Sequence, residues 1–290
     1  MEIEIRPLTS HSTIAQVESV QKAAWGIGDR ETIPAHFLHA LQHNGANLLG
    51  AFDGDQLIGF TFSTLAMIEK GNRIDEVAAA RLKLYSVATG VHPDYQGQHI
   101  GQRLKLAQRE FALRIGVRLI TWTFDPLESR NGHFNIGKLG AICNRYLPNF
   151  HGNLSGLNAG LPTDRLEVEW WVTSNRVQSR VSQKRSSLSF DALLGGGALL
   201  INEATFNSSG LPLPPANYIS HPSNLLLMEI PTNFQHIKQT DPDLAQRWRD
   251  HSRSLLQKLF DSDFIITDFT TYHDAAGQQR SFYLLTYRDS

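Results

Sequence analysis

The stretch HPDYQGQHIG, residues 92–101, joins two segments of opposite character. Before it, RLKLYSVATGV (81–91) has the β-branched and aromatic content of a buried strand. After it, apolar residues recur at helical spacing from Ile100 to Ile115. RLITWTF (118–124) then predicts a second strand. The order strand, glycine-rich turn, helix, strand is typical of a crossover unit with parallel strands.

The glycine-rich turn has the features of an anion site. A helix N-terminus leaves its first N–H groups without partners and carries a partial positive charge. Glycines just before the helix allow the backbone to approach a bulky anion such as a pyrophosphate. Gly97 and Gly101 suit this use, and the amides from about Gly97 to Gln102 would be the donors. The alternative interpretation is a turn that only redirects the chain.

Composition indicates an ordinary globular protein. The 290 residues are 41% hydrophobic and 19% charged, with a net charge of −1, and they suit one large domain or two small ones. This charge favours neither nucleic acid nor an anionic membrane as a partner. Apolar runs are shorter than the ~20 residues of a membrane span.

Cys143 is the single cysteine, which excludes an intrachain disulfide and favours a reducing compartment. The N-terminal residues MEIEIRPLTS lack the apolar core of a signal peptide. We therefore expect a cytoplasmic protein.

The segments before the turn also alternate between strand and helix signals. EIEIRPL (2–8) has the period-two pattern of a strand, and a helix is expected over about 14–25. A second short helix should begin near Pro34 and bury one face. The run from 47 to 65 predicts a hairpin about an Asp-Gly-Asp turn. The apolar face of the short helix comprises Phe37, Leu38 and Leu41.

The second half contains further strands and one strongly signalled helix. Asp241 can cap this helix, and Pro242 suits its first turn. Its apolar face comprises Leu244, Trp248, Leu255 and Leu259. Flanking strands repeat the order of residues 84–124 without the glycine-rich turn, which indicates either a degenerate duplication or an unrelated α/β half. We expect domains at 1–155 and 156–290.

A basic stretch, SNRVQSRVSQKRSSLS (174–189), contains four cations and no acid. The simpler interpretation is a solvated, flexible loop. The alternative is a flap that meets an anionic ligand. The cations are Arg176, Arg180, Lys184 and Arg185.

The turn sequence VHPDYQGQHIGQRL (91–104) resembles the acyl-CoA-binding motif of the GNAT acyltransferase superfamily, Gln/Arg-x-x-Gly-x-Gly/Ala. The order of elements from residue 2 to about 150 resembles that family too. TFDPLESRNGHFNIGKLG (123–140) is similar to the signature of an uncharacterised subgroup. The resemblance implies an α/β (α+β type) fold, with a mixed, mostly antiparallel central sheet flanked by helices. It implies an acyl-CoA-dependent N-acyltransferase, most simply an acetyltransferase, with acetyl-CoA or another acyl-CoA as co-substrate.

The resemblance also assigns binding residues. Val91 would present the N–H that polarises the thioester carbonyl, and Asn131 and Asn135 fall where the family binds the pantetheine amides. His99 departs from the motif, because glycine is usual there; a histidine tolerates a left-handed conformation less well than glycine. The residues matched to the phosphate turn are Gln96, Gly97, Gln98, His99, Ile100, Gly101 and Gln102.

Catalytic candidates are less well defined. In the family the strands matching 81–91 and 118–124 splay apart, and a tyrosine on the following helix often protonates the thiolate. That helix, about 129–142, has no tyrosine. The candidates are Tyr146, His133, Tyr85 and Asp125; for each, a structural role is the alternative, such as a satisfied core hydroxyl or an Asp turn before Pro126.

Three other function classes remain open at this level. The first is a GNAT-shaped ligand-binding or regulatory module without turnover. The second is nucleic-acid binding, which only the stretch 174–189 supports. The third is metal binding: the histidines at 36, 39 and 43 share a helix face, but zinc-site spacings and an HExxH run are absent from the sequence. We expect no metal and an amine acceptor on a small molecule or peptide.

Overall fold

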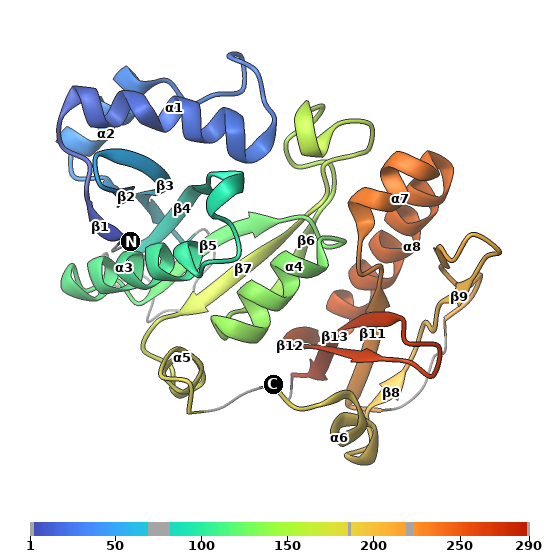
Figure 1. Cartoon of the computed structure of the whole chain (residues 1–290). Helices are drawn as coiled ribbons and strands as arrows, with labels where there is room; N and C mark the ends of the chain where they lie inside the picture. Colours follow the sequence, from blue (N-terminus) through green and yellow to red (C-terminus); the bar gives the residue numbers. More distant parts are fainter. Residues whose placement is uncertain (1–2, 69–81, 185–186, 219–222, 289–290) are drawn as a thin grey trace. The chain divides into compact units, whose positions relative to one another are not determined.

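The computed structural model describes residues 3–68, 82–184, 187–218 and 223–288 (Figure 1). The chain forms two compact units, and the backbone passes from one to the other within strand β5 (Leu119–Phe124). Unit 1 comprises the chain up to Trp122 with 154–159 and 171–173, and unit 2 comprises the remainder. The compact units do not follow the expected boundary at 155/156, because residues 123–153 belong to unit 2. The domains at 1–155 and 156–290 stay a prediction.

The sheet of unit 1 has the strand order β1-β2-β3-β4-β5. Strands β1 to β4 are antiparallel neighbours, and β5 runs parallel to β4, as the crossover pattern predicts. The expected strand 81–91 is present from Leu82, and Arg81 lies outside the described residues. The bounds of these strands are β1 (Glu4–Pro7), β2 (Asn47–Asp53), β3 (Gln56–Met67) and β4 (Leu82–Val91).

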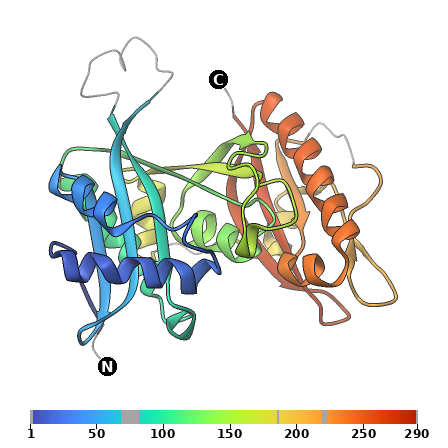
Figure 2. The ribbon, with the colours of Figure 1, turned by 90° about the horizontal axis from the view of Figure 1, so that it is seen from above.

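Helices cover both faces of this sheet (Figures 1 and 2). Helices α1 (His11–Trp25) and α2 (Ala35–His43) pack on the face of Phe60 and Phe62. Helix α3 (Ile100–Arg114) buries Ile100 and Leu104 on the other face. Alternation of side chains along β2 and β3 builds both cores. Two expected core residues are exposed instead: Phe37 (50%), and Ile115 (41%), which lies just beyond the end of α3.

The strands of unit 2 follow the mostly antiparallel order β7-β6-β12-β13-β11-β8, and β9 and β10 form a separate ribbon. Strands β11 and β12 flank the long helix in the sequence, and β13 lies between them in the sheet. The corresponding strands of unit 1, β4 and β5, pair directly with each other. The duplication stays a prediction. The strands are β6 (Ile142–Leu147), β7 (Arg165–Trp171), β8 (Leu199–Leu200), β9 (Thr205–Phe206), β10 (Pro212–Leu213), β11 (Leu225–Ile230), β12 (Phe264–His273) and β13 (Gln279–Tyr287).

The helices of unit 2 include the long one predicted from sequence. Helix α8 begins at Pro242, and the Asp241 side chain accepts a hydrogen bond from Leu244 N (2.9 Å). All four residues of its predicted apolar face are buried. The others are α4 (Ser129–Gly132), the π-helical turn η3 (His133–Lys138), α5 (Asn175–Val181), α6 (Phe190–Gly195) and α7 (Phe234–Thr240); short 3₁₀ turns are η2 (Pro93–Tyr95) and η4 (Gly156–Asn158).

The basic stretch 174–189 is not a solvated loop over most of its length. Ser174 caps α5, and Arg180 is buried with its guanidinium paired to Asp268 (2.5 Å). Arg176 donates to the Gly140 and Thr267 carbonyls. These arginines serve internal packing, because each has an acceptor within unit 2. Arg185 and Ser186 lie outside the described residues.

Within the described ranges, no helix has the length and apolarity needed to cross a membrane. The same part of the chain holds no group of three or more His, Cys, Asp or Glu side chains placed to bind a metal ion.

Candidate functional site

The turn before α3 presents a row of main-chain donors. The amides from Gly97 to Gln102 donate no hydrogen bond to any residue that the structure describes. The first helical amide bond is Arg103 N to His99 O (3.0 Å). Residues 96–99 are exposed, so the turn before the helix faces solvent. Unpartnered amides at a helix N-terminus, together with the helix dipole, are chemically suited to an anion.

Two residues of this turn have left-handed backbone. Gly97 has φ 84°, and His99 has φ 60° and ψ 11°. The motif position that usually holds glycine therefore does need a positive φ here. Histidine adopts it at a cost of about 1 kcal/mol or more relative to glycine.

Side chains of unit 1 hold the turn in place. Gln96 Nε2 donates to the Val91 carbonyl (3.1 Å), and Tyr95 Oη donates to Asp53 Oδ2 (3.1 Å). A Cβ added at Gly101 would lie 3.9 Å from Val91 Cγ2, and no left-handed conformation is needed there. A Cβ at Gly101 would thus make an ordinary contact with Val91 and would need no shift of the backbone.

Strands β4 and β5 separate next to this turn. They pair only at Leu84 with Ile120 and at Tyr85 with Thr121. A bulge follows in β4, because Ser86 faces Ser63 and Ala88 faces Phe62, which leaves Val87 without a counterpart in β3. The parallel ladder therefore ends before the turn, as the family resemblance implies.

The half-buried Tyr85 lies in unit 1, at the last β4–β5 pair. Its side chain is on the face of β4 opposite to that of Ser86, since successive side chains alternate. The other three catalytic candidates belong to unit 2.

The segment after β5 is an irregular helix. Helix α4 has a single turn, with Asn131 N donating to Glu128 O (2.9 Å), and η3 continues it with π-helical bonding. Such π turns are rare and occur often at functional sites. Asn135 is buried at 4% exposure, whereas Asn131 is exposed. Their predicted contact with pantetheine stays a prediction.

His133 lies at the start of η3, with its ring edge-on to Phe269. Burial, with a smaller effect from Lys138, lowers the pKa of His133. The neutral imidazole is therefore its main form at neutral pH. It has no hydrogen bond to the described acids and arginines around Asp125.

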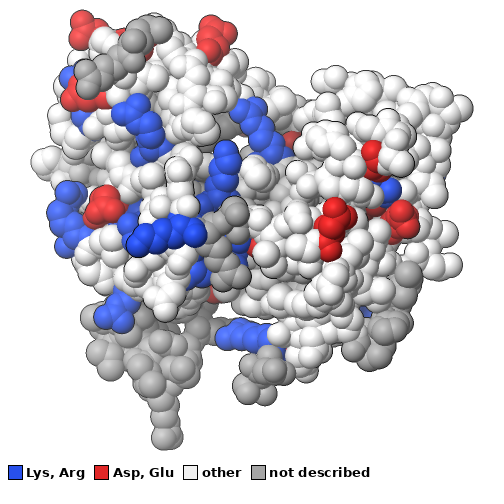
Figure 3. Space-filling view, turned by 60° about the horizontal axis from the view of Figure 1, so that its bottom comes forward, with Lys and Arg blue, Asp and Glu red and all other residues white. Residues whose placement is uncertain are grey.

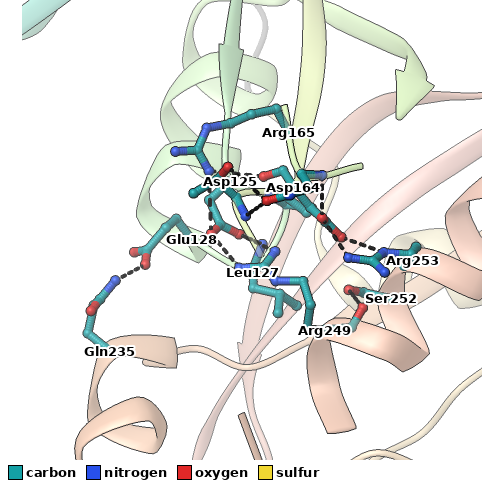
Figure 4. A network of polar contacts seen from close by, with 12 residues as sticks. Asp125, Leu127, Glu128, Asp164, Arg165, Gln235, Arg249, Ser252 and Arg253 are labelled. Atoms are coloured by element: carbon teal, nitrogen blue, oxygen red, sulfur yellow. Dashed lines mark hydrogen bonds and ion pairs between the residues drawn. The ribbon is translucent and has the colours of Figure 1, made fainter. Parts of the chain in front are cut away.

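Asp125 lies in a buried polar network of unit 2 that includes Asp164 (Figure 4), and Tyr146 joins this network through Asp164. Asp125 accepts two hydrogen bonds from Arg249 (2.9 and 2.6 Å), and its Oδ1 also accepts from Leu127 N (2.9 Å). Tyr146 Oη donates to Asp164 Oδ2 (2.6 Å). Asp125 therefore forms both the turn before the helix and a buried bidentate ion pair.

Asp164 is the second acid of the network and is fully buried. It accepts two hydrogen bonds from Arg253 (2.8 Å each) and one from Asn149 N (2.9 Å). Burial acts to raise its pKa, but the hydrogen bonds from Arg253 and Tyr146 lower it overall. Burial and the bond to Asp164 raise the pKa of Tyr146, so this phenol stays protonated.

Glu128 borders this network and was not predicted from sequence. It is half-buried, and its Oε1 accepts from Gln235 Nε2 (2.5 Å). Burial raises the pKa of Glu128, and the bond from Gln235 opposes this only in part. A carboxyl group with a raised pKa suits proton transfer. The sequence signal that could have identified Glu128 is its position just after β5, in the turn that Asp125 begins.

Sequence reasoning also missed the residues that hold Asp125 and Asp164. Arg249 and Arg253 lie four residues apart on α8, beside its apolar face, and this spacing was the only signal. Cys143 is fully buried, and burial raises the pKa of its thiol.

Comparisons with protein-family models and with curated proteins found no match. Solved structures do resemble part of the chain. NAA60 of Arabidopsis thaliana, in complex with a bisubstrate analogue, is 17% identical, with 59% of this chain and 98% of that chain covered and a TM-score of 0.48. The ribosomal-protein-S18-alanine N-acetyltransferase of Escherichia coli is 12% identical, with 60% and 96% covered and a TM-score of 0.45. At these values a likeness assigns no activity to the chain.

Proposed function

We propose that the chain is an acyl-CoA-dependent N-acyltransferase of the GNAT type, with acetyl-CoA as the simplest donor. The observation that carries the proposal is the row of unpartnered amides from Gly97 to Gln102 at the start of α3. They would bind the CoA pyrophosphate through N–H groups and the helix dipole. The opening of the β4–β5 ladder supports it, because a pantetheine arm needs such a gap.

The reaction would transfer the acyl group directly from the thioester to an amine on a small molecule or peptide. A main-chain donor at Val91, near the end of β4, would stabilise the oxyanion that develops on the thioester carbonyl. The amine loses a proton to a base, and the thiolate leaves with a proton from an acid. Asn131 and Asn135 would bind the pantetheine amides.

Among the acids and bases of unit 2, Glu128 has the most suitable properties for the base. Its pKa is raised by burial, and its carboxylate accepts a hydrogen bond from the neutral Gln235 amide. Asp125 is held by Arg249, which favours a positioning role. Tyr146, His133 and Tyr85 remain candidates for the acid. Glu128→Gln should lower kcat far more than KM if Glu128 is the base.

Calorimetry with acetyl-CoA tests whether the chain binds acyl-CoA at the turn before α3. Gly101→Asp should abolish binding, because the side chain fits the fold but adds negative charge where the pyrophosphate would lie. Gly28→Asp is a matched control: Gly28 is exposed, has no left-handed conformation and has no atom near its added Cβ. Absence of binding by the unaltered chain at millimolar acyl-CoA would contradict the proposal.

A binding module without turnover is the second candidate. It is favoured by the engagement of Asp125 and Tyr146 in structural contacts and by the strained His99. Release of free thiol from acetyl-CoA across a panel of amines separates the two. Binding without amine-dependent thiol release would favour the module.

A nucleic-acid role has lost its main support, because Arg176 and Arg180 of the basic stretch are used within unit 2. On the face drawn in Figure 3, basic side chains are separated by uncharged surface, and acidic side chains lie on the same face. The net charge of −1 agrees with this mixed surface.

A further inference from the structure

Lys105, on the phosphate-turn helix α3, is a buried amine at the point where β4 and β5 separate. It is 3% exposed. The last β4–β5 pair is Tyr85 with Thr121, and the residues that follow are Ser86 and Trp122. Lys105 Nζ lies 2.7 Å from Ser86 Oγ and 3.8 Å from the ring centroid of Trp122. One side chain of α3 thus contacts both strands where their ladder ends.

The hydrogen-bonding groups around Lys105 are complete only when its amine is neutral. Gln108 Oε1 lies 3.1 Å from Nζ, and Gln108 Nε2 donates both to Ser86 Oγ (3.1 Å) and to Thr61 Oγ1 (3.0 Å). With a neutral amine, the Ser86 hydroxyl donates to the Nζ lone pair, and Lys105 donates to Gln108, which closes a ring. The second N–H of the amine faces the Trp122 ring.

Protonation breaks this arrangement. The ammonium group has three donors and no lone pair, so the Ser86 hydroxyl must accept from both Lys105 and Gln108. Its own hydrogen then has no acceptor, because Ser86 has no further partner in the described parts of the chain. A buried donor without an acceptor costs free energy.

No charged group offsets that cost; the face of the Trp122 ring attracts an ammonium, but burial outweighs it. The side chains that face Nζ are Ser86 from β4, Gln108 from α3 and Trp122 from β5, with Thr61 of β3 beyond Gln108. Among the described residues, no acid or second base acts on the amine; burial alone lowers the pKa of Lys105 to about 7.

We propose that Lys105 is a positioning residue that sets the opening between β4 and β5, and that it does so only as the neutral amine. The charged amine would need a rearranged Ser86, next to the Val87 bulge. Acyl-CoA affinity would then depend on the protonation of a residue that never touches the ligand. This inference rests on the proposed function.

The test combines two measurements on the full chain. Lysine ¹³Cε NMR of the ligand-free protein follows each amine against pH, and Lys105→Met identifies the Lys105 resonance. We expect its midpoint near 7, well below that of the exposed lysines. An ordinary lysine midpoint for Lys105 would overturn the inference, whether or not acyl-CoA binds.

Calorimetry with acetyl-CoA supplies the second measurement. Binding restricted to the neutral form weakens about tenfold for each pH unit below the midpoint. Lys105→Met should remove this dependence, and any part that remains does not come from Lys105. Equal pH profiles for the two proteins would refute the coupling while the proposed function stands. Absence of binding at every pH would refute both, and the NMR midpoint would then report only on the buried amine.

If Lys105→Met does not fold, Gln108→Glu provides an alternative test. It preserves the shape of the side chain and places a carboxylate near Nζ, which favours the ammonium form. The midpoint of acetyl-CoA binding should move to higher pH. An unmoved midpoint would overturn the inference.

Discussion

The Lys105 amine lies 2.7 Å from the Ser86 hydroxyl, immediately after the last pair between β4 and β5. The contact between Lys105 and Ser86 links α3, the helix that presents the phosphate turn, to β4, the strand that would carry the oxyanion donor. Two parts of the proposed acyl-CoA site therefore share one buried polar group, and its protonation has consequences for stability as well as for binding.

Lys105 should make the stability of the protein rise with pH above neutrality. Its pKa is about 7 in the folded chain and 10.5 when exposed, so between these values the unfolded chain binds more protons. Unfolding free energy should increase over this window by at most roughly 5 kcal/mol. Urea unfolding of the unaltered protein and of Lys105→Met measures the difference; parallel pH curves would contradict the prediction.

His99 should be replaceable by glycine but not by a β-branched residue. At φ 60°, His99→Gly relieves strain but adds freedom to the unfolded chain, so stability should change by less than about 1 kcal/mol. His99→Val should cost roughly 1–3 kcal/mol and weaken acetyl-CoA binding. Thermal unfolding and calorimetry check both variants. Stronger binding by the valine variant would contradict this account of the turn.

Loss of Arg249 should cost more than loss of Arg253. Arg249 is 1% exposed and pairs with Asp125 through both terminal nitrogens. Arg249→Met leaves this nearly buried carboxylate with the Leu127 amide and a longer ion pair to Arg165 (3.8 Å), and the change should cost up to roughly 3–5 kcal/mol. The side chain of Arg253 is 29% exposed. Without it, Asp164 still accepts from Tyr146 and Asn149. Chemical unfolding ranks the two variants, and the reverse order would contradict the network in Figure 4.

Tyr146→Phe should make the protein more sensitive to acid. The folded-state pKa of Asp164 is depressed, so its contribution is complete above its unfolded pKa and is lost as pH falls toward the folded value. Removing the phenol removes one of the hydrogen bonds that lower this pKa, so the loss should begin at higher pH. The cost at neutral pH should be roughly 1.5–3 kcal/mol. An unchanged acid transition would show that Tyr146 does not stabilise the carboxylate.

Local sequence signals predicted most helices and strands. They could not predict contacts between residues that are far apart in the sequence. The turn at 92–101 and the start of α8 at Pro242 depend on neighbouring residues, and both are present. The burial of Arg180 depends on Asp268, 88 residues away, so the basic stretch was interpreted as a loop.

The same limit applies to the site. Asp125 is separated from Arg249 by 124 residues, so the sequence could name the carboxylate but not its partner. Lys105 adjoins the predicted apolar face of α3, and only the contacts with β4 and β5 show that its amine is buried. The strain at His99, by contrast, was predictable, because glycine is usual at that position of the motif.

Amide NMR during a coenzyme A titration tests the central claim most directly. The account predicts that the resonances of Gly97 to Gln102 shift first and furthest, with a downfield change where each N–H meets a phosphate oxygen. Unchanged resonances for this turn at saturating coenzyme A would contradict it.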